Sequence, residues 1–408
     1  MSDPKLSELI GPGTADEFTD RYEEAMMKTF ARPPRILARG QGARVWDVDG
    51  NEYLDLLAGI AVNSLGHAHP FVTAAISEQL ATLGHISNLF ASPAQIALGE
   101  KLDALVTAND PERGARVFFT NSGTEANEAA FKVTRRTGRT RIVAMEGSFH
   151  GRTMGALAVT ANPSYRQPFE PLPGEVTFVP YGDLDALRAA VDETVAAVVI
   201  EPIQGENGVV TLPEGYLVQA RELTTAHGAL LWLDEIQTGI GRCGHWLASE
   251  PTGVTADLVT VAKGLGAGFP IGACVATGAT AELLTAGHHG TTFGGNPAAA
   301  IAGLSVLSVI EREGLLERTR ELGDNLAAAI TALEHPLIDH VRGAGLLRGV
   351  VLTEQIGPKV VTAALEAGYI LNAPRPGVLR LAPPLIIEQA DLDRFVHDLP
   401  TILESARA

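Results

Sequence analysis

Val195-Ala-Ala-Val-Val-Ile200 is apolar at every position and rich in β-branched residues, which is typical of a strand that is buried on both faces of a sheet. Similar runs recur along the chain, with helical patterns between several of them. They lie at 116–119, 141–145, 229–233 and 258–262. Buried strands that alternate with helices predict a mostly parallel sheet with helices on both faces, and therefore an α/β fold.

Both ends of the chain predict short strands and helices of a second, smaller domain. These elements are a strand and turn at 45–57, helical spacing at 302–310 and 316–333, and short strands near 349–353 and 378–381. Asp49-Gly50 gives the first of them a hairpin signal. We therefore expect a large domain over 76–304 and a small α+β domain formed by 1–75 and 305–408 together.

Composition excludes several classes of protein. A length of 408 residues favours two packed domains with a cleft between them. The residues are 46% hydrophobic and 19% charged, as in a folded α/β protein. A net charge of −17 disfavours a nucleic-acid partner. Cys243 and Cys274 lack partners at metal or disulfide spacing, so a reducing cytoplasm fits best. Residues 1–10 lack the apolar core of a secretory signal, and no apolar stretch approaches the roughly 20 residues of a membrane span.

A lysine marks the end of one predicted strand. Ala262-Lys263-Gly264 closes the run 258–262 and opens a glycine-dense loop. Ligands of open α/β sheets bind at the carboxyl ends of the strands, and a lysine with a lowered pKa can form a Schiff base with an aldehyde there. A lysine at a strand end is more often a solvated surface residue, so neighbouring motifs have to decide between these interpretations.

A carboxylate follows the preceding strand. The run 229–233 leads directly into Asp234-Glu-Ile-Gln237, and a carboxylate at the end of a buried strand is costly without a cationic partner. The protonated ring nitrogen of a pyridine cofactor would be such a partner, with Gln237 free to bond a ring hydroxyl. In isolation, an aspartate that caps a turn is equally compatible with Asp234.

Two further motifs follow strands at the same predicted edge. Thr120-Asn-Ser-Gly-Thr-Glu-Ala-Asn127 leads into a helical pattern, so Ser122, Gly123 and Thr124 predict a phosphate site at a helix start, although a simple helix cap is the alternative. Phe149-His-Gly-Arg152 offers an aromatic ring that could stack on a planar cofactor and an arginine that could bind a carboxylate. Alone, these two residues could equally be core packing and a surface charge.

Two other patterns do not support a function. Gly239-Ile-Gly-Arg-Cys-Gly244 satisfies the dinucleotide spacing, but four residues separate it from Asp234 and Pro251 interrupts the segment after it, so we reject a Rossmann site. The histidines have no acidic or cysteine partners at metal spacing, and we expect no metal site. The histidines considered as possible ligands are His67, His69, His288 and His289.

As an ordered set, the motifs resemble those of the class III, or subgroup II, aminotransferases of fold type I, most closely the acetylornithine aminotransferases. The similarity covers nearly the whole chain. It is carried by 53–67, 121–127, 149–153, 201–206, 233–242, 262–264 and 290–297. The resemblance implies a sheet of the seven-stranded type and pyridoxal 5'-phosphate (PLP) bound as a Schiff base on Lys263.

The resemblance also implies how the cofactor is held. Asp234 would pair with the ring nitrogen, Gln237 would bond the ring oxygen, and Phe149 would stack on the ring. Gly123 and Thr124 would hold the phosphate. In similar enzymes a threonine of the neighbouring subunit, here Thr292, completes the phosphate site, which implies a homodimer with shared active sites.

Four residues are implied in substrate binding. Arg152, with Thr291 nearby, would take the carboxylate of an acetylated substrate, and Arg380 would be a second carboxylate clamp for glutamate and 2-oxoglutarate. Glu206 would be a gate that pairs with Arg380 in one half-reaction and releases it in the other. Asn207 stands where many similar enzymes continue with glycine, and this departure bears on the local turn and on substrate preference.

The implied reaction is transamination of N2-acetylornithine with 2-oxoglutarate, and two alternatives stay open. The first is another ω-aminotransferase that acts on ornithine, succinylornithine, 4-aminobutyrate or a carrier-bound lysine precursor. The second is a cofactor-binding or regulatory protein without turnover. Lys263, Asp234 and Arg152 together argue against the second, because a buried charge without a task is costly.

Overall fold

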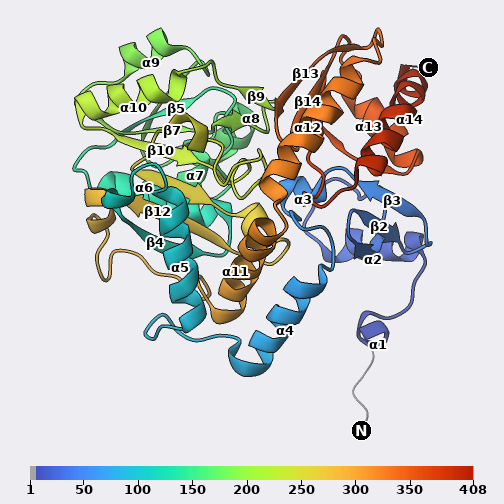
Figure 1. The fold of residues 1–408 in the computed structure, drawn as a ribbon, viewed down its shortest axis with the longest axis horizontal. Coiled ribbons are helices and arrows are strands. Elements are labelled where there is room, and N and C mark those ends of the chain that lie inside the picture. Colours follow the sequence, from blue (N-terminus) through green and yellow to red (C-terminus); the bar gives the residue numbers. More distant parts are fainter. Residues whose placement is uncertain (1–5, 408) are drawn as a thin grey trace.

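A seven-stranded sheet forms the centre of the larger part of the molecule (Figure 1). The computed structural model describes residues 6–407. The strands, in spatial order, are β4 (Ala115–Thr120), β12 (Gly272–Thr277), β11 (Leu258–Val261), β10 (Leu230–Asp234), β7 (Val195–Ile200), β5 (Arg141–Met145) and β6 (Glu175–Val179). Only β12 runs antiparallel to its neighbours. The mostly parallel sheet is thus confirmed, and five of its strands lie where the sequence predicts them.

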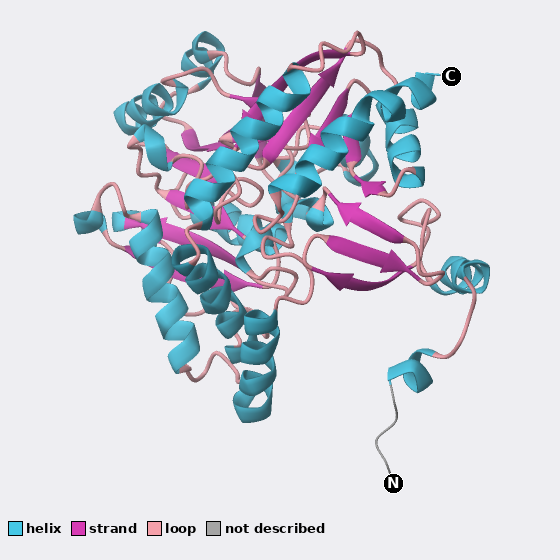
Figure 2. Cartoon of the chain, turned by 45° about the vertical axis from the view of Figure 1, so that its right-hand side comes forward, coloured by secondary structure: helices cyan, strands magenta, loops and turns pink. Residues whose placement is uncertain are grey.

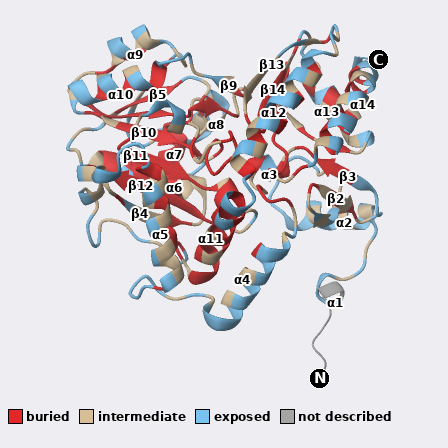
Figure 3. Ribbon diagram, in the orientation of Figure 1, coloured by how far each residue is buried: buried red, intermediate tan, exposed pale blue. Residues whose placement is uncertain are grey.

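Both faces of this sheet are covered, because successive residues of each strand enter different hydrophobic clusters. On β7, Val198 and Ile200 belong to the cluster with helices α5, α9, α10 and α11, whereas Val199 packs with α6 and α7 on the other face. These helices span Pro93–Val106 (α5), Gly123–Arg135 (α6), Met154–Ala158 (α7), Leu184–Ala190 (α9), Tyr216–His227 (α10) and Pro297–Arg312 (α11). The prediction of strands that are apolar on both faces is confirmed, and Figure 3 shows their burial.

The smaller part combines both ends of the chain (Figure 2). One sheet contains β1 (Leu37–Gln41), β2 (Arg44–Asp47), β3 (Glu52–Asp55) and β15 (Tyr369–Ile370); another contains β13 (Ile338–Ala344), β14 (Leu347–Leu352), β17 (Val378–Leu381) and β16 (Asn372–Arg375). Strands β2 and β3 form the expected hairpin, and β3 pairs in parallel with β15 from the far end of the sequence. Helices α2 (Ala15–Ala25), α12 (Leu315–Thr331), α13 (Gly357–Glu366) and α14 (Gln389–Arg407) complete this part.

Two long helices cross the predicted domain limits. The limit at 75/76 falls within α4 (Pro70–Leu83), and the limit at 304/305 falls within α11. One continuous hydrophobic cluster also includes residues of both parts. Of the segment 1–10, residues 1–5 lie outside the described residues. Among residues 6–407, no helix combines the length and the apolar character that a membrane crossing requires.

Parallel strands bring the predicted motifs to one edge. The carboxyl ends of β4, β5, β7, β10 and β11 face the same way, so the residues that follow them converge. A cavity of about 440 Å³ lies at this edge.

Candidate active site

The cavity collects most of the residues that the sequence singles out. Those predicted residues that line it are Ser122, Gly123, Thr124, Phe149, Arg152, Asp234, Gln237 and Lys263. They come from segments far apart in the sequence, and only the sheet brings them together. The remaining predicted residues lie at other places, described below.

Lys263 lies two residues after the end of β11 and has an unusual backbone conformation. Its φ is 34°, in the left-handed region that is costly for a residue with a side chain. The next residue, Gly264, accepts a hydrogen bond at 2.9 Å from the hydroxyl of Ser64, which ties the turn to the amino-terminal segment. Burial lowers the pKa of Lys263, so a larger fraction of this amine is neutral and nucleophilic than for an exposed lysine.

Asp234 is held by a buried polar network. Its Oδ2 accepts hydrogen bonds from Asn127 Nδ2 at 2.8 Å and from His150 Nδ1 at 2.7 Å, while Oδ1 accepts from the Ile236 N–H at 3.0 Å. Burial alone would lower the pKa of His150, but the bond to Asp234 and the charges of Asp234 and Glu201 raise it. These three hydrogen bonds therefore fix the orientation of the carboxylate.

Helix α6 begins at the predicted anion site. The hydroxyl of Ser122 accepts from the Glu125 N–H at 3.3 Å, and the Ser122 carbonyl takes the Ala126 N–H. This leaves the N–H groups of Gly123 and Thr124, in the first turn, for an external anion. The Thr124 hydroxyl lies 2.7 Å from the Thr153 hydroxyl. Thr153 is thus a neighbour of the helix start that the sequence did not identify as part of this site.

Aromatic side chains and a buried carboxylate complete the cavity near β5 and β7. The Phe149 N–H donates to Glu201 Oε1 at 2.9 Å, and burial raises the pKa of Glu201 to about 7. The Arg152 guanidinium lies over the Tyr165 ring, 3.5 Å from its centroid, and 5.7 Å from the Phe149 ring. Stacking on Tyr165 orients Arg152 while leaving its in-plane N–H groups free to bind a carboxylate. Sequence reasoning missed Tyr165.

Arg380 lies beside the cavity on β17 and is fully buried. Its Nη1 donates to Glu206 Oε1 at 2.6 Å and to Gln237 Oε1 at 3.1 Å, and its Nε donates to Asn372 Oδ1 at 3.1 Å. Nη2 is buried without a hydrogen-bond partner in the described chain. Burial would raise the pKa of Glu206, but the charge and hydrogen bond of Arg380, with smaller effects of Lys263 and Gln237, together lower this pKa. The structure therefore brings Arg380, Glu206 and Gln237 together.

Two predicted residues, Thr291 and Thr292, do not line the first cavity. Thr291 Oγ1 accepts from the Gly294 N–H at 3.1 Å, and Thr292 is exposed. Asn88 Nδ2 donates to the carbonyls of Thr291 and Gly294, so this loop lies against the segment that follows α4. In this chain, Thr291 is therefore partly buried and Thr292 lies on the molecular surface.

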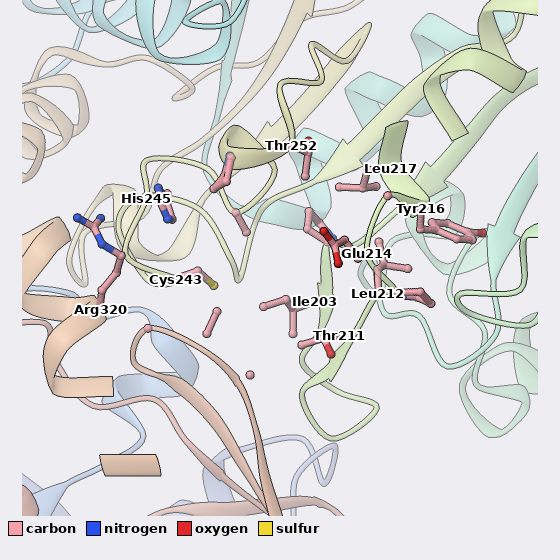
Figure 4. A pocket seen from close by; sticks show the side chains of 18 of the residues that line it. Ile203, Thr211, Leu212, Glu214, Tyr216, Leu217, Cys243, His245, Thr252 and Arg320 are labelled. Atoms are coloured by element: carbon pink, nitrogen blue, oxygen red, sulfur yellow. The ribbon is translucent and has the colours of Figure 1, made fainter. Parts of the chain in front are cut away.

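A second cavity of about 460 Å³ has a different lining (Figure 4). It contains Cys243, His245 and Arg320, and none of the predicted site residues. Burial raises the pKa of the Cys243 thiol, so this thiol stays protonated and unreactive at neutral pH, and burial lowers the pKa of His245. Volume alone does not distinguish the two cavities, but only the first combines an amine, a carboxylate and a helix start. Among residues 6–407, no cluster of three or more His, Cys, Asp or Glu residues could hold a metal ion.

Comparison with known proteins identifies the family. The model of the family described as aminotransferase class III matches residues 26–403. The chain belongs to the class-III aminotransferases. It is 57% identical over 386 residues to an acetylornithine aminotransferase of Mycolicibacterium smegmatis, which covers 95% of this chain and 98% of that protein.

Solved structures agree with the class-III fold. The ornithine aminotransferase of Toxoplasma gondii ME49 superposes with a TM-score of 0.90, 32% identity and 99% coverage of both chains. An amine transaminase of an uncultivated Pseudomonas species, solved in its PLP-bound form, has a TM-score of 0.83 and 28% identity, and the match covers 94% of this chain and 97% of that one. The fold is therefore fold type I, the protein is an aminotransferase, and its cofactor is PLP.

The first cavity fits this class-III cofactor. An amine, Lys263, and a buried carboxylate, Asp234, line the same cavity as the start of α6. A Cβ at Gly123 would come within 2.8 Å of the Ile236 side chain, so glycine lets the helix start pack closely against Ile236. Aldehyde, ring nitrogen and phosphate of PLP match these three groups.

Proposed function

We propose that this aminotransferase transfers the δ-amino group of N2-acetyl-L-ornithine to 2-oxoglutarate, giving N-acetyl-L-glutamate 5-semialdehyde and L-glutamate. The observation that carries the proposal is the placement of Lys263 and Asp234 in one cavity that Arg152 also lines. The 57% identity to an enzyme of that name supports the choice of substrate. Arginine biosynthesis would be the pathway that uses this reaction.

Each residue of the cavity has a proposed role. Lys263 would hold the cofactor covalently, Asp234 would keep the ring nitrogen protonated, and Phe149 would stack on the ring. Ser122, Gly123 and Thr124 would bind the phosphate at the start of α6. Gln237 would bond the ring oxygen from the position where it already contacts Arg380.

When bound, PLP supplies an electron sink that stabilises negative charge on the substrate carbon. Lys263 Nζ, once released by the incoming amine, would take the proton from that carbon and return it on the cofactor side. Burial favours this role, because it lowers the pKa of Lys263. Asn127 and His150 would act as positioning residues, since both hydrogen-bond the Asp234 carboxylate and Asn127 also donates to the His150 carbonyl at 2.6 Å.

Two carboxylate clamps would serve two substrates of different geometry. The δ-amine of acetylornithine lies far from its carboxylate, so Arg152, with Thr291 nearby, would anchor it at a distance from Lys263. Glutamate reacts at its α carbon and needs a closer clamp, which Arg380 would provide through its unpartnered Nη2. Glu206 would cover Arg380 in the first half-reaction and leave it in the second.

A substrate panel tests this function. With 2-oxoglutarate as acceptor, we expect kcat/KM for acetylornithine to exceed that for ornithine, succinylornithine and 4-aminobutyrate by about tenfold or more, since each lost contact costs a comparable factor. A clear preference for 4-aminobutyrate would refute the assignment. Absence of turnover with every donor, in protein that carries its cofactor, would favour the regulatory interpretation instead.

A homodimer with shared active sites is the proposed assembly. Exposed apolar residues gather where the link after α4 meets the loop around Thr292: Leu89 is 86%, Phe90 72% and Phe293 58% exposed, and His85 contacts Phe293 with ring centroids 5.0 Å apart. We call Leu89, Phe90 and Phe293 the apolar patch. Such a patch favours a partner surface, and a second copy would bring Thr292 to the neighbouring phosphate site.

Leu89→Asp should weaken this dimer. A charge in the apolar patch, which the dimer would bury, is expected to raise the dimer dissociation constant about tenfold or more and to reduce cofactor retention, because Thr292 would be withdrawn. Analytical ultracentrifugation and cofactor release during dialysis measure both effects. Val218→Asp, on the outer surface of α10, is the matched control and should change neither. A monomeric wild type with full activity would overturn the shared site. The cytoplasm as location and the domain limits stay predictions from the sequence.

A further inference from the structure

Asn207, next to Glu206, connects the large part of the molecule to the small part. Its Oδ1 accepts from Arg375 Nε and Nη2 at 3.2 and 2.9 Å, and its Nδ2 donates to Gln204 Oε1 at 2.9 Å. Gln204 is fully buried and donates to the Glu146 carbonyl at 2.8 Å. The side chain of Asn207 is thus held on both sides, by Gln204 from the large part and by Arg375 of β16 from the small part.

The backbone around Glu206 is fixed as well. The N–H groups of Gly208 and Val209 both donate to the Gly205 carbonyl, at 3.1 and 3.3 Å, and Arg342 of β13 donates to the Gly208 carbonyl at 2.8 and 3.0 Å. A Cβ at Gly205 would collide with the Gln237 side chain. These contacts hold 205–209 together as one turn that packs against Arg342 and Gln237.

Glu206 itself has more freedom than its surroundings. Its side chain is 34% exposed, whereas that of Arg380 is fully buried. A rotation of the Glu206 side chain would carry its carboxylate to solvent, where a charge is well hydrated, and would uncover Arg380 without any change of the backbone. The place of the residue 206 backbone relative to Arg380 then decides how well the Glu206 carboxylate reaches the guanidinium.

We propose that Asn207 and Arg375 form a latch that holds residue 206 at the distance from Arg380 at which the Glu206–Arg380 pair closes. Both are positioning residues, because neither touches the cavity. The inference rests on the proposed function, in which a closed pair suits acetylornithine and an open pair suits five-carbon dicarboxylates. Loosening the latch should weaken the closed pair and shift the balance between the two half-reactions.

Asn207→Ala tests the latch in the holoenzyme. We expect the Kd of glutarate, an unreactive five-carbon dicarboxylate, to fall about three- to tenfold in calorimetry, as a competing hydrogen-bonded pair is weakened. KM for 2-oxoglutarate should fall by a similar factor and KM for acetylornithine should rise, with kcat changed less than about twofold. Arg375→Ala should act in the same direction, and the double variant should equal either single variant.

The outcomes separate a latch from a merely structural contact. Asn325→Ala, which removes an exposed side-chain hydrogen bond on α12, is the matched control and should leave all these constants unchanged. A parallel loss for both substrates, an unchanged glutarate Kd, or additive effects of Asn207 and Arg375 would overturn the latch. If the wild type turns over neither acetylornithine nor glutamate, the proposed function fails, and the glutarate arm still decides whether the latch controls access to Arg380.

Discussion

Lys263→Ala is expected to lower kcat by about 10³-fold or more and to abolish the visible absorption of the lysine-linked cofactor. The reason is that Lys263 provides the amine at the carboxyl end of β11 that both binds the cofactor and moves the proton. The other groups of the site, including the start of α6 and Asp234, remain in place. The variant should therefore bind the cofactor without the covalent bond and lose it on dialysis.

Absorption spectra before and after dialysis, with stopped-flow single turnovers, measure both effects. Lys359→Ala, an exposed residue of α13, is the matched control and should keep the colour and activity of the wild type. The thermal unfolding midpoint of Lys263→Ala should be measured in parallel. Without the covalent bond to the cofactor, residue 263 can leave its left-handed conformation, with a φ of 34°, more easily. A variant that keeps the colour and turnover of the wild type would eliminate Lys263 as the reactive amine.

Asp234→Asn is the second change with a large expected effect. A neutral amide cannot hold a proton on the ring nitrogen, so kcat should fall about 10²- to 10³-fold, the range for loss of one preorganised charge contact. The pKa of His150 provides an independent measure of the loss of the Asp234 charge. Its pKa is raised by the hydrogen bond and charge of Asp234 against the lowering effect of burial, so in the variant it should lose its proton at lower pH than in the wild type. NMR titration of the imidazole measures this.

Asp257→Asn is the matched control for Asp234. Asp257 is also a buried carboxylate, but it lies just before the amino end of β11, paired with Arg113 and Arg221. Its loss should lower the free energy of unfolding and leave the cofactor spectrum and the kcat of the folded fraction intact. If Asp234→Asn transaminates at the rate of the wild type, the pairing of this carboxylate with the ring nitrogen is wrong.

The sequence predicts the central strands because they are apolar at every position. The runs 141–145 and 195–200 coincide with β5 and β7 to the residue. Strand β12 was not predicted, because Gly272-Ala-Cys-Val-Ala-Thr277 consists mostly of small residues and its antiparallel placement depends on register with β4 and β11. Strand β6 lies at an edge and is less buried, which weakens the pattern.

Within the site, the sequence predicts the residues that lie at or just after the carboxyl end of a strand. Lys263 and Asp234 were found because each comes after a buried run, and both line the same cavity. The contacts of Asp234 with Asn127 and His150 could not be predicted, since β4, β5 and β10 come together only through the order of strands in the sheet. The stacking of Arg152 on Tyr165 depends likewise on tertiary packing.

The parallel pairing of β3 with β15 has a consequence for how the protein is made. Tyr369 and Ile370 lie beside Leu54 and Asp55, so the first sheet of the chain lacks its last strand until about 300 further residues have left the ribosome. At typical rates of translation this takes roughly 15 to 60 s. During that interval the nascent amino-terminal hairpin presents an unpaired edge, which is the kind of surface that molecular chaperones cover.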